Sequence, residues 1–239
     1  MTGWERALKR AAFIALIVAM QIGGAAEAGS VNRKTKITYY NVEGSTYAEL
    51  MLSIHINAPR HEGSVALAML KSNIKPDFVP ASGNQCKLRD IRFTLNNEMV
   101  LPRLRDTKSL PGKMRRRFNA FQAAVRRHEE EHAKIYYGCI SRLRQDILSL
   151  PGSPDCDTYQ RQVVALIKAA RATCDVQNDA LDKRDGQRVS KLPVIQDALQ
   201  EASNGKVPKE LLVKLRATSL RSDFRGTTGV LIDHSRDRR

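Results

Sequence analysis

The chain has 239 residues and a formal net charge of +15, with 40 Lys and Arg against 25 Asp and Glu. Such a basic protein favours polyanionic partners. Aromatic residues make up only 5% of the chain, and none alternate with the arginine clusters, which argues against a surface that stacks nucleic-acid bases. A solvated basic surface without a specific partner is the simpler interpretation.

Residues 1–28 are predicted to be a signal peptide. Arg6, Lys9 and Arg10 precede a short apolar stretch, and the small residues around Glu27 place the cleavage site before Gly29. We therefore expect a protein that is exported, periplasmic or secreted, with an uncleaved N-terminal membrane anchor as the alternative. The polyanions it would meet are envelope polymers and lipid headgroups before nucleic acid.

Three regions follow the signal peptide. We expect an N-terminal α+β region over residues 29–110, a helical metal-site region over 111–188, and a C-terminal helical extension with a basic tail over 189–239. The rest of the chain is long enough for one medium domain or two small ones.

The N-terminal region is predicted to alternate strands with one helix. Residues 36–40 read as a strand, and Thr46 with Glu49 forms a capping box that opens a helix. Residues 65–70 and 86–95 are further candidate strands. Residues 95–99 resemble a hairpin turn into a strand that Pro102 ends.

The helical region begins with a long amphipathic helix. From Met114 to Ile147 the apolar positions recur in alternating steps of three and four, and Pro-Gly pairs lie on both sides of this stretch. A second helix is expected from Thr158 to about Ala180, followed by a charged loop at residues 182–186. Shorter helices are expected at 194–202 and from Pro208 through Leu215.

The long helix carries the motif HExxH as residues 128–132. His128 and His132 lie one turn apart on the same face, so both imidazoles can bind one metal ion, and Glu129 is placed to activate a water on that metal. Both histidines fall in the apolar seam. The alternative is a pair of core histidines that are hydrogen-bonded to carbonyl or carboxylate groups.

The cysteines indicate oxidation rather than thiolate chemistry. An even number of cysteines in an exported chain predicts two disulfides, with three connectivities open. No CxxC spacing is present, which argues against a thiolate zinc site. The four residues are Cys86, Cys139, Cys156 and Cys174.

Three stretches together resemble a bacterial family of predicted secreted zinc-dependent proteases. They are residues 39–44 (YYNVEG) with Glu49 and Leu50, residues 93–95 (FTL) leading to 100–102 (VLP), and the HEEEH of residues 128–132. The resemblance covers roughly residues 35–190. It implies an export signal, a zincin-like site and a presumed peptidase activity.

The third zinc ligand is expected to be Asp182. A catalytic zinc generally takes three protein ligands and a water, and a second helix that folds back on the first brings its far end near the metal. The family pattern Asp-x-x-Thr-x-His-Gly matches here only at Asp182, because its His-Gly pair is replaced by Gln187 and Arg188. If that histidine were the ligand, this chain would be a weakened or inactive relative. The competing ligands are Asp157, Asp179, Asp185 and His234.

The predicted fold is therefore α+β and zincin-like, with the mixed N-terminal region packed on the helical half that carries HExxH. The predicted function is an exported zinc peptidase in which Glu129 is the general base and a strand aligns an extended peptide or protein substrate. Tyr136 and Tyr137 are candidate stabilisers of the oxyanion. The alternative is a catalytically weak or inactive relative that acts as a cationic envelope-binding protein with zinc, if any, as a structural element.

Overall fold

The computed structural model describes residues 31–61, 64–106 and 110–205. The predicted signal peptide, the helix expected from Pro208, the basic tail and His234 lie outside the described residues. The described elements, in chain order, are β1 (Val31–Val42), α2 (Tyr47–Asn57), β2 (Arg60–His61), β3 (Ser64–Val65), β4 (Met69–Pro80), β5 (Leu88–Leu104), α3 (Gly112–Ser149), α4 (Cys156–Val189) and α5 (Pro193–Ser203). This mixture confirms an α+β protein. None of the described helices is both long and apolar enough to cross a membrane.

The main sheet has three strands in the order β1-β5-β4, with β5 in the centre. β5 is parallel to β1 and antiparallel to β4. The hairpin turn predicted at residues 95–99 is wrong, because these residues lie inside β5. Asn97 is buried there, and its Oδ1 accepts a hydrogen bond of 2.8 Å from Oγ of Ser72 on β4. A partner on the neighbouring strand thus overrides the turn preference of the asparagines.

Pro102 does not end its strand as predicted, because β5 continues to Leu104. The pairing of β4 with β5 reaches only Val100, so Pro102 has a strand partner on the β1 side alone. A proline is tolerated where a strand is locally an edge, since its missing N–H breaks no ladder there. The predicted strand at 65–70 is also largely wrong: β4 begins at Met69 and runs through Pro80.

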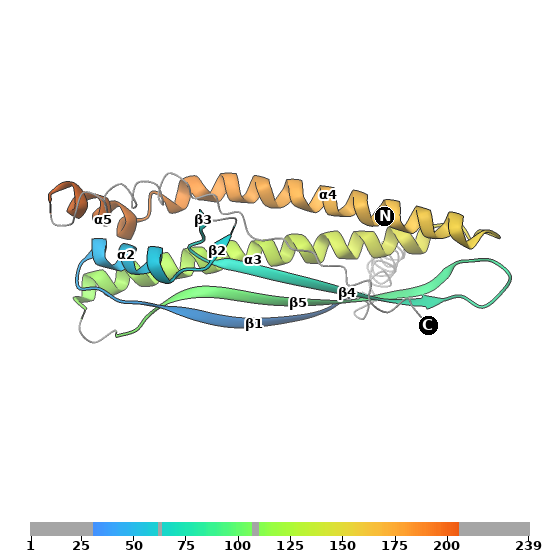
Figure 1. The fold of residues 1–239 in the computed structure, drawn as a ribbon, viewed down its shortest axis with the longest axis horizontal. Coiled ribbons are helices and arrows are strands. Elements are labelled where there is room, and N and C mark those ends of the chain that lie inside the picture. The colour runs from blue at the N-terminus through green and yellow to red at the C-terminus, as the bar shows by residue number, and fades with distance from the viewer. Residues whose placement is uncertain (1–30, 62–63, 107–109, 206–239) are drawn as a thin grey trace, which may run out of the picture. The chain divides into compact units, whose positions relative to one another are not determined.

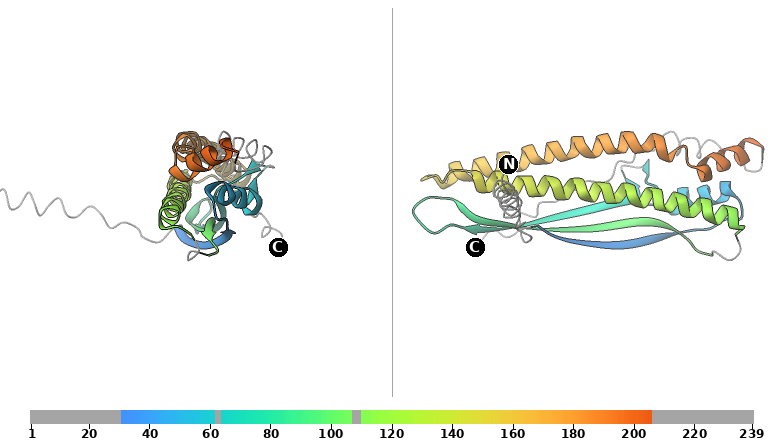
Figure 2. Two further views of the ribbon diagram at one scale, coloured as in Figure 1. Left: turned by 90° about the vertical axis from the view of Figure 1, so that its left-hand side faces the viewer. Right: turned by 180° about the vertical axis from the view of Figure 1, so that it is seen from behind.

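Helix α3 lies along the sheet, and α4 lies along the opposite side of α3 (Figure 1, Figure 2). The predicted seam of α3 is confirmed, since Phe118, Phe121 and Val125 are buried in the core with the histidines that follow them. Arg144 fixes α3 to β5 through a hydrogen bond of 3.0 Å to the carbonyl of Ile91 and an ion pair of 2.9 Å with Asp90. α3 is therefore buried on two sides, which places its middle turns between the sheet and α4.

Helix α4 extends further than predicted. It was expected to end near Ala180, before a loop at residues 182–186, but it runs without interruption to Val189. Three charged residues of this stretch have partners: Asp182 pairs with the two histidines on α3, and Arg184 and Asp185 pair with each other. The Asp185–Arg188 pair, one turn apart, supports a helix that composition alone would assign to a loop. The helix predicted at 194–202 is confirmed as α5.

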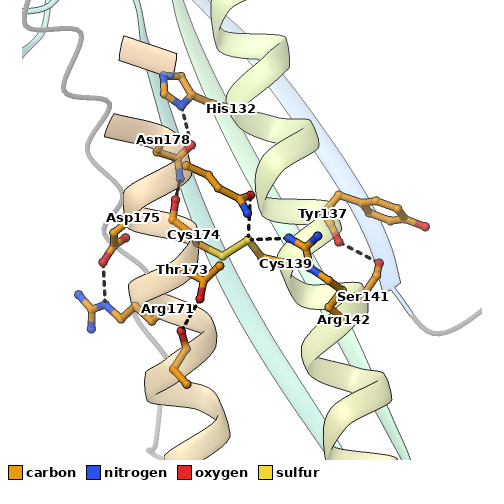
Figure 3. Close-up of a disulfide and its surroundings, with 12 residues drawn as sticks. His132, Tyr137, Cys139, Ser141, Arg142, Arg171, Thr173, Cys174, Asp175 and Asn178 are labelled. Atoms are coloured by element: carbon orange, nitrogen blue, oxygen red, sulfur yellow. Dashed lines mark hydrogen bonds and ion pairs between the residues drawn. A yellow bond between two sulfur atoms is a disulfide. The ribbon is translucent and has the colours of Figure 1, made fainter. Parts of the chain in front are cut away.

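Two disulfides are present, as predicted, and the structure decides their pairing. Cys86 is bonded to Cys156 with a Cα–Cα distance of 5.1 Å, which joins the segment between β4 and β5 to the start of α4. Cys139 is bonded to Cys174 with a Cα–Cα distance of 6.1 Å (Figure 3). The second bridge joins α3 directly to α4 and sets their register beside the two histidines.

Candidate metal centre

The two histidines of the motif face each other in the interior. His128 is 3% exposed and His132 is 1% exposed, and their Nε2 atoms are 3.0 Å apart. This arrangement follows from the helix, because residues four apart lie one above the other on the same face. Two buried ring nitrogens that point at one place need a shared partner.

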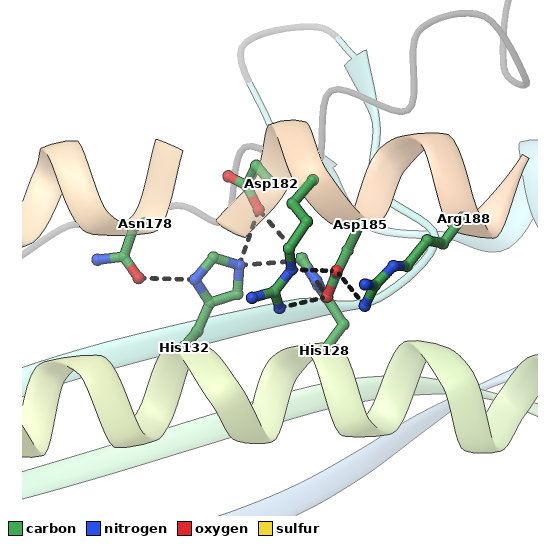
Figure 4. Close-up of polar contacts among 7 residues, drawn as sticks. His128, His132, Asn178, Asp182, Asp185 and Arg188 are labelled. Atoms are coloured by element: carbon green, nitrogen blue, oxygen red, sulfur yellow. Dashed lines mark hydrogen bonds and ion pairs between the residues drawn. The ribbon is translucent and has the colours of Figure 1, made fainter. Parts of the chain in front are cut away.

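Asp182 supplies that partner from α4. Its Oδ1 is 2.8 Å from Nε2 of His132 and 3.1 Å from Nε2 of His128 (Figure 4). These three residues form the group among the described residues that could hold a metal ion. The three atoms are 2.8–3.1 Å from one another, close enough for one zinc ion to bind all three at its usual bond lengths of about 2.0 Å to nitrogen and oxygen.

Asn178 fixes the tautomer of His132. Its Nδ2 donates to the carbonyl oxygen of Cys174 at 2.9 Å, so its Oδ1 is the atom that lies 2.7 Å from Nδ1 of His132 (Figure 3). An amide oxygen only accepts, and therefore Nδ1 of His132 carries the proton. Nε2, which faces His128 and Asp182, is left with its lone pair.

Asp185 does the same for His128. Its Oδ2 lies 3.2 Å from Nδ1 of His128, and a carboxylate accepts the proton that this nitrogen carries. Hydrogen bonds from Arg184 are the largest influence that keeps the pKa of Asp185 below its ordinary value, so the carboxylate stays ionised. Nε2 of His128 thus also presents a lone pair to the centre.

Three electron pairs therefore converge on one point: two imidazole nitrogens and a carboxylate oxygen. They repel one another unless a cation lies between them. A proton can fill this role in part. Burial alone would lower the pKa of His132, but the hydrogen bond to Asp182, the charge of Glu129 and the hydrogen bond to Asn178 together raise it above its ordinary value. A divalent ion would satisfy all three atoms at once.

Glu129 lies beside the cluster and is 1% exposed. Burial raises its pKa to about 7, against the lowering effect of the two histidines and of a backbone hydrogen bond from Leu70 on β4. Its Oε2 has no hydrogen-bond partner among the described residues. A buried carboxylate with one unsatisfied oxygen is suited to accept a proton from a ligand such as water.

The other residues considered from the sequence lie differently. Asp179 is exposed on α4, and Asp157 lies in the first turn of that helix. Gln187, at the position of the histidine in the family pattern, is also exposed. Tyr136 is buried and its hydroxyl has no described hydrogen-bond partner, whereas Tyr137 is 43% exposed.

Two supporting residues were not assigned their roles from the sequence. The sequence predicts no role for Asn178, and it predicts Asp185 only as an alternative ligand. A usable signal exists, because Cys174, Asn178, Asp182 and Asp185 continue the steps of three and four that begin at Val163. Because the helix was predicted to end near Ala180, the residues beyond that point were not recognised as part of the same helix face.

The family is identified by comparison with known sequences. Residues 37–188 match a family described as bacterial protein of unknown function, DUF922. The chain belongs to this family. The matched segment contains the whole cluster and its supporting residues, from β1 almost to the end of α4. Neither the curated proteins nor the solved structures contain a match to this chain.

Proposed function

We propose that the protein is an exported zinc-dependent peptidase. In this proposal, His128, His132 and Asp182 hold the ion and Glu129 acts as the general base. The observation that carries it is the convergence of two imidazole lone pairs and one carboxylate oxygen, all within 3.1 Å of one another, beside a buried glutamate.

The donor set supports zinc. Zinc binds imidazole and carboxylate, and three protein ligands leave a fourth position for water or substrate. The four cysteines are bound in disulfides and offer no competing thiolate site. Two histidines and a carboxylate also bind iron, but a glutamate directly after the first histidine on a helix is typical of zinc hydrolases.

Each residue then has a definite task. A bound zinc would polarise the scissile carbonyl and lower the pKa of a water. Glu129 takes the proton of that water and later delivers it to the leaving amine. Asn178 and Asp185 hold the two imidazoles in the tautomer that leaves Nε2 free.

The sheet offers a way to align a peptide. β4 is an outer strand of the sheet, and its residue Leu70 is hydrogen-bonded to Glu129. An extended peptide that pairs with this outer strand would run past the general base. This relation between an outer strand and the motif helix is the support that the fold offers for a zincin-like site.

One observation favours the alternative of a non-enzymatic envelope-binding protein. The candidate ligands are only 1–7% exposed, so a substrate has little direct access to them. A buried metal can instead serve to join α3 to α4, while the basic surface binds anionic polymers or lipid headgroups. The two functions differ in whether Glu129 matters for anything other than folding.

The deciding experiment combines metal analysis with peptide cleavage. The mature wild-type protein should bind one zinc per chain by elemental analysis, and His132→Ala should purify nearly free of metal. The zinc-loaded wild type should cleave members of a broad peptide library. Glu129→Gln should keep its zinc but lose activity by about 100-fold or more.

Glu130→Gln is the matched control, because Glu130 is adjacent, partly exposed and paired with Arg126 at 2.8 Å. It should retain wild-type activity. Stoichiometric zinc in His132→Ala would overturn the metal site. A wild type that binds zinc but cleaves nothing, or that cleaves no better than Glu129→Gln, would leave the binding protein as the function.

A further inference from the structure

An open pocket of about 490 Å³ lies against His128, between α3 and α4. Its polar lining consists of Arg127, His128, Glu131, Arg184, Asp185 and Arg188, and we call it the arginine pocket. It borders both His128 and Asp185, whose Nδ1 and Oδ2 atoms are 3.2 Å apart, and it does not include His132 or Glu129. The pocket therefore flanks the candidate metal centre at the His128 end.

The carboxylates of the arginine pocket are already engaged. Asp185 accepts hydrogen bonds from Arg184 at 2.7 and 3.2 Å and from Arg188 at 3.5 Å, besides its contact with His128. Glu131 is paired with Lys134 at 2.6 Å. A ligand in the pocket thus meets acidic groups whose charge is balanced by protein cations.

The cations of the pocket are in excess. Arg184 and Arg188 share a single carboxylate, which leaves N–H groups on both guanidiniums for a ligand. Arg127 has no ion pair with any of the described carboxylates. Arg127 is exposed on α3, and Arg184 and Arg188 are exposed on α4, so the positive groups approach the pocket from both helices.

We propose that the arginine pocket binds a carboxylate group of the substrate, so that the peptidase selects peptides with an acidic group close to the scissile bond. This inference rests on the proposed function for its second half only. A guanidinium binds a planar carboxylate through paired hydrogen bonds, which gives both affinity and orientation. Because the pocket borders His128, a carboxylate bound in it would lie next to the candidate metal centre, so its position in the peptide would be close to the scissile bond.

Two sources offer the same carboxylate chemistry: the C-terminus of a peptide and the side chain of Asp or Glu. Three uncleaved probes distinguish them: acetyl-tetra-alanine as the free acid, the same peptide as its C-terminal amide, and an amidated peptide with one internal Glu. Binding is measured by calorimetry on the metal-free protein at physiological salt, because a bound zinc would itself attract carboxylates.

We expect at least one acidic probe to bind about tenfold or more tightly than the neutral amide. Arg127→Gln should remove most of this preference. Arg126→Gln is the matched control: it removes the same charge one residue away, from a side chain that is paired with Glu130 outside the pocket. The acidic probe that binds identifies the source.

Any of three results would overturn the proposed carboxylate site. The first is that the acidic probes and the neutral amide bind equally tightly, and the second is that Arg126→Gln and Arg127→Gln lose the preference for the acidic probe to the same extent. The third result is that no probe binds at millimolar concentration. Failure of the proposed function looks different. An acid preference that depends on Arg127, in a protein that cleaves nothing, would support the pocket and reject the peptidase. If wild type and Arg127→Gln both cleave peptide acids and peptide amides with the same KM, that result would support the peptidase and reject the arginine pocket.

Discussion

Asn178 links His132 to the backbone of Cys174: its Oδ1 accepts from Nδ1 of the histidine at 2.7 Å, while its Nδ2 donates to the cysteine carbonyl at 2.9 Å (Figure 3). The amide thereby holds the imidazole in the tautomer that directs a lone pair towards Asp182. The same cysteine is bonded to Cys139 on α3. A covalent bridge between the helices is thus two contacts away from His132.

Replacing Asn178 should weaken metal binding without removing a ligand. In Asn178→Ala the ring of His132 loses its acceptor, and we expect zinc affinity to fall about 10- to 100-fold, as for other groups that orient a ligand. Asn178→Asp keeps an acceptor and should restore most of the affinity. Competition with a chromophoric chelator measures both, and wild-type affinity in Asn178→Ala would contradict the orienting role.

The Cys139–Cys174 bridge should matter for the metal as well as for stability. Replacing both residues with Ser should lower the free energy of unfolding by about 3 kcal/mol and should also weaken zinc binding, because α4 is freer to shift along α3. The Cys86–Cys156 pair is the control, since it lies at the start of α4. Its replacement should reduce stability but leave zinc affinity near wild type. Equal zinc affinity in the two double mutants would argue against the bridge as a support of the site.

Asp182 can be tested against its neighbour on the same helix. Asp182→Asn should reduce zinc affinity by 100-fold or more, because an amide oxygen is a poor substitute for a carboxylate ligand. Asp179→Asn removes the same charge from an exposed position three residues away and should have little effect. Similar losses in both variants would show that the effect is general electrostatics, and the third ligand would have to be sought elsewhere.

The raised pKa of Glu129 predicts that the metal-free protein becomes less stable against unfolding as the pH rises. Its pKa of about 7 in the fold exceeds the ordinary value of 4.5 because burial disfavours the charge. The stabilising contribution of protonated Glu129 to the free energy of unfolding is fully present below pH 4.5 and is lost as the pH rises through about 7. Metal-free Glu129→Gln should therefore gain stability over wild type at pH 8.5, on the order of 3 kcal/mol, and gain little near pH 5. Denaturant unfolding at the two pH values measures it, and an equal difference at both would refute the burial effect.

Local patterns in the sequence were sufficient for several elements. The steps of three and four from Met114 to Ile147 predicted α3, and the pair Thr46 and Glu49 predicted the start of α2, where both hydrogen bonds of the capping box form. These features depend on residues three or four apart, which are neighbours in any helix. The spacing of His128 and His132 is of the same kind, so half of the candidate site could be predicted before the fold was known.

The remaining elements depended on partners distant in the chain. Asn96 and Asn97 favour a turn locally, yet they lie in a strand because β1 and β4 pair with β5 on its two sides. Residues 182–186 have the composition of a loop, yet they remain helical with Asp182 and Asp185 turned towards α3. These carboxylates are buried and paired with histidines that lie about 50 residues earlier in the chain, so a short stretch of sequence does not reveal the stabilisation that keeps these residues helical.

The sequence by itself therefore determined two candidate metal ligands, their spacing and the candidate general base, since these three residues belong to one turn of one helix. Asp182 was predicted as the third ligand ahead of four competitors, whereas no orienting role was predicted for Asn178 or Asp185. All three come from a helix about 50 residues further on, and the packing of α4 against α3 decides which of its side chains meet the histidines. Which carboxylate meets a pair of histidines is set by the register of two helices. That register is fixed by a disulfide and a buried interface whose energies are properties of the folded chain, and no single segment contains them.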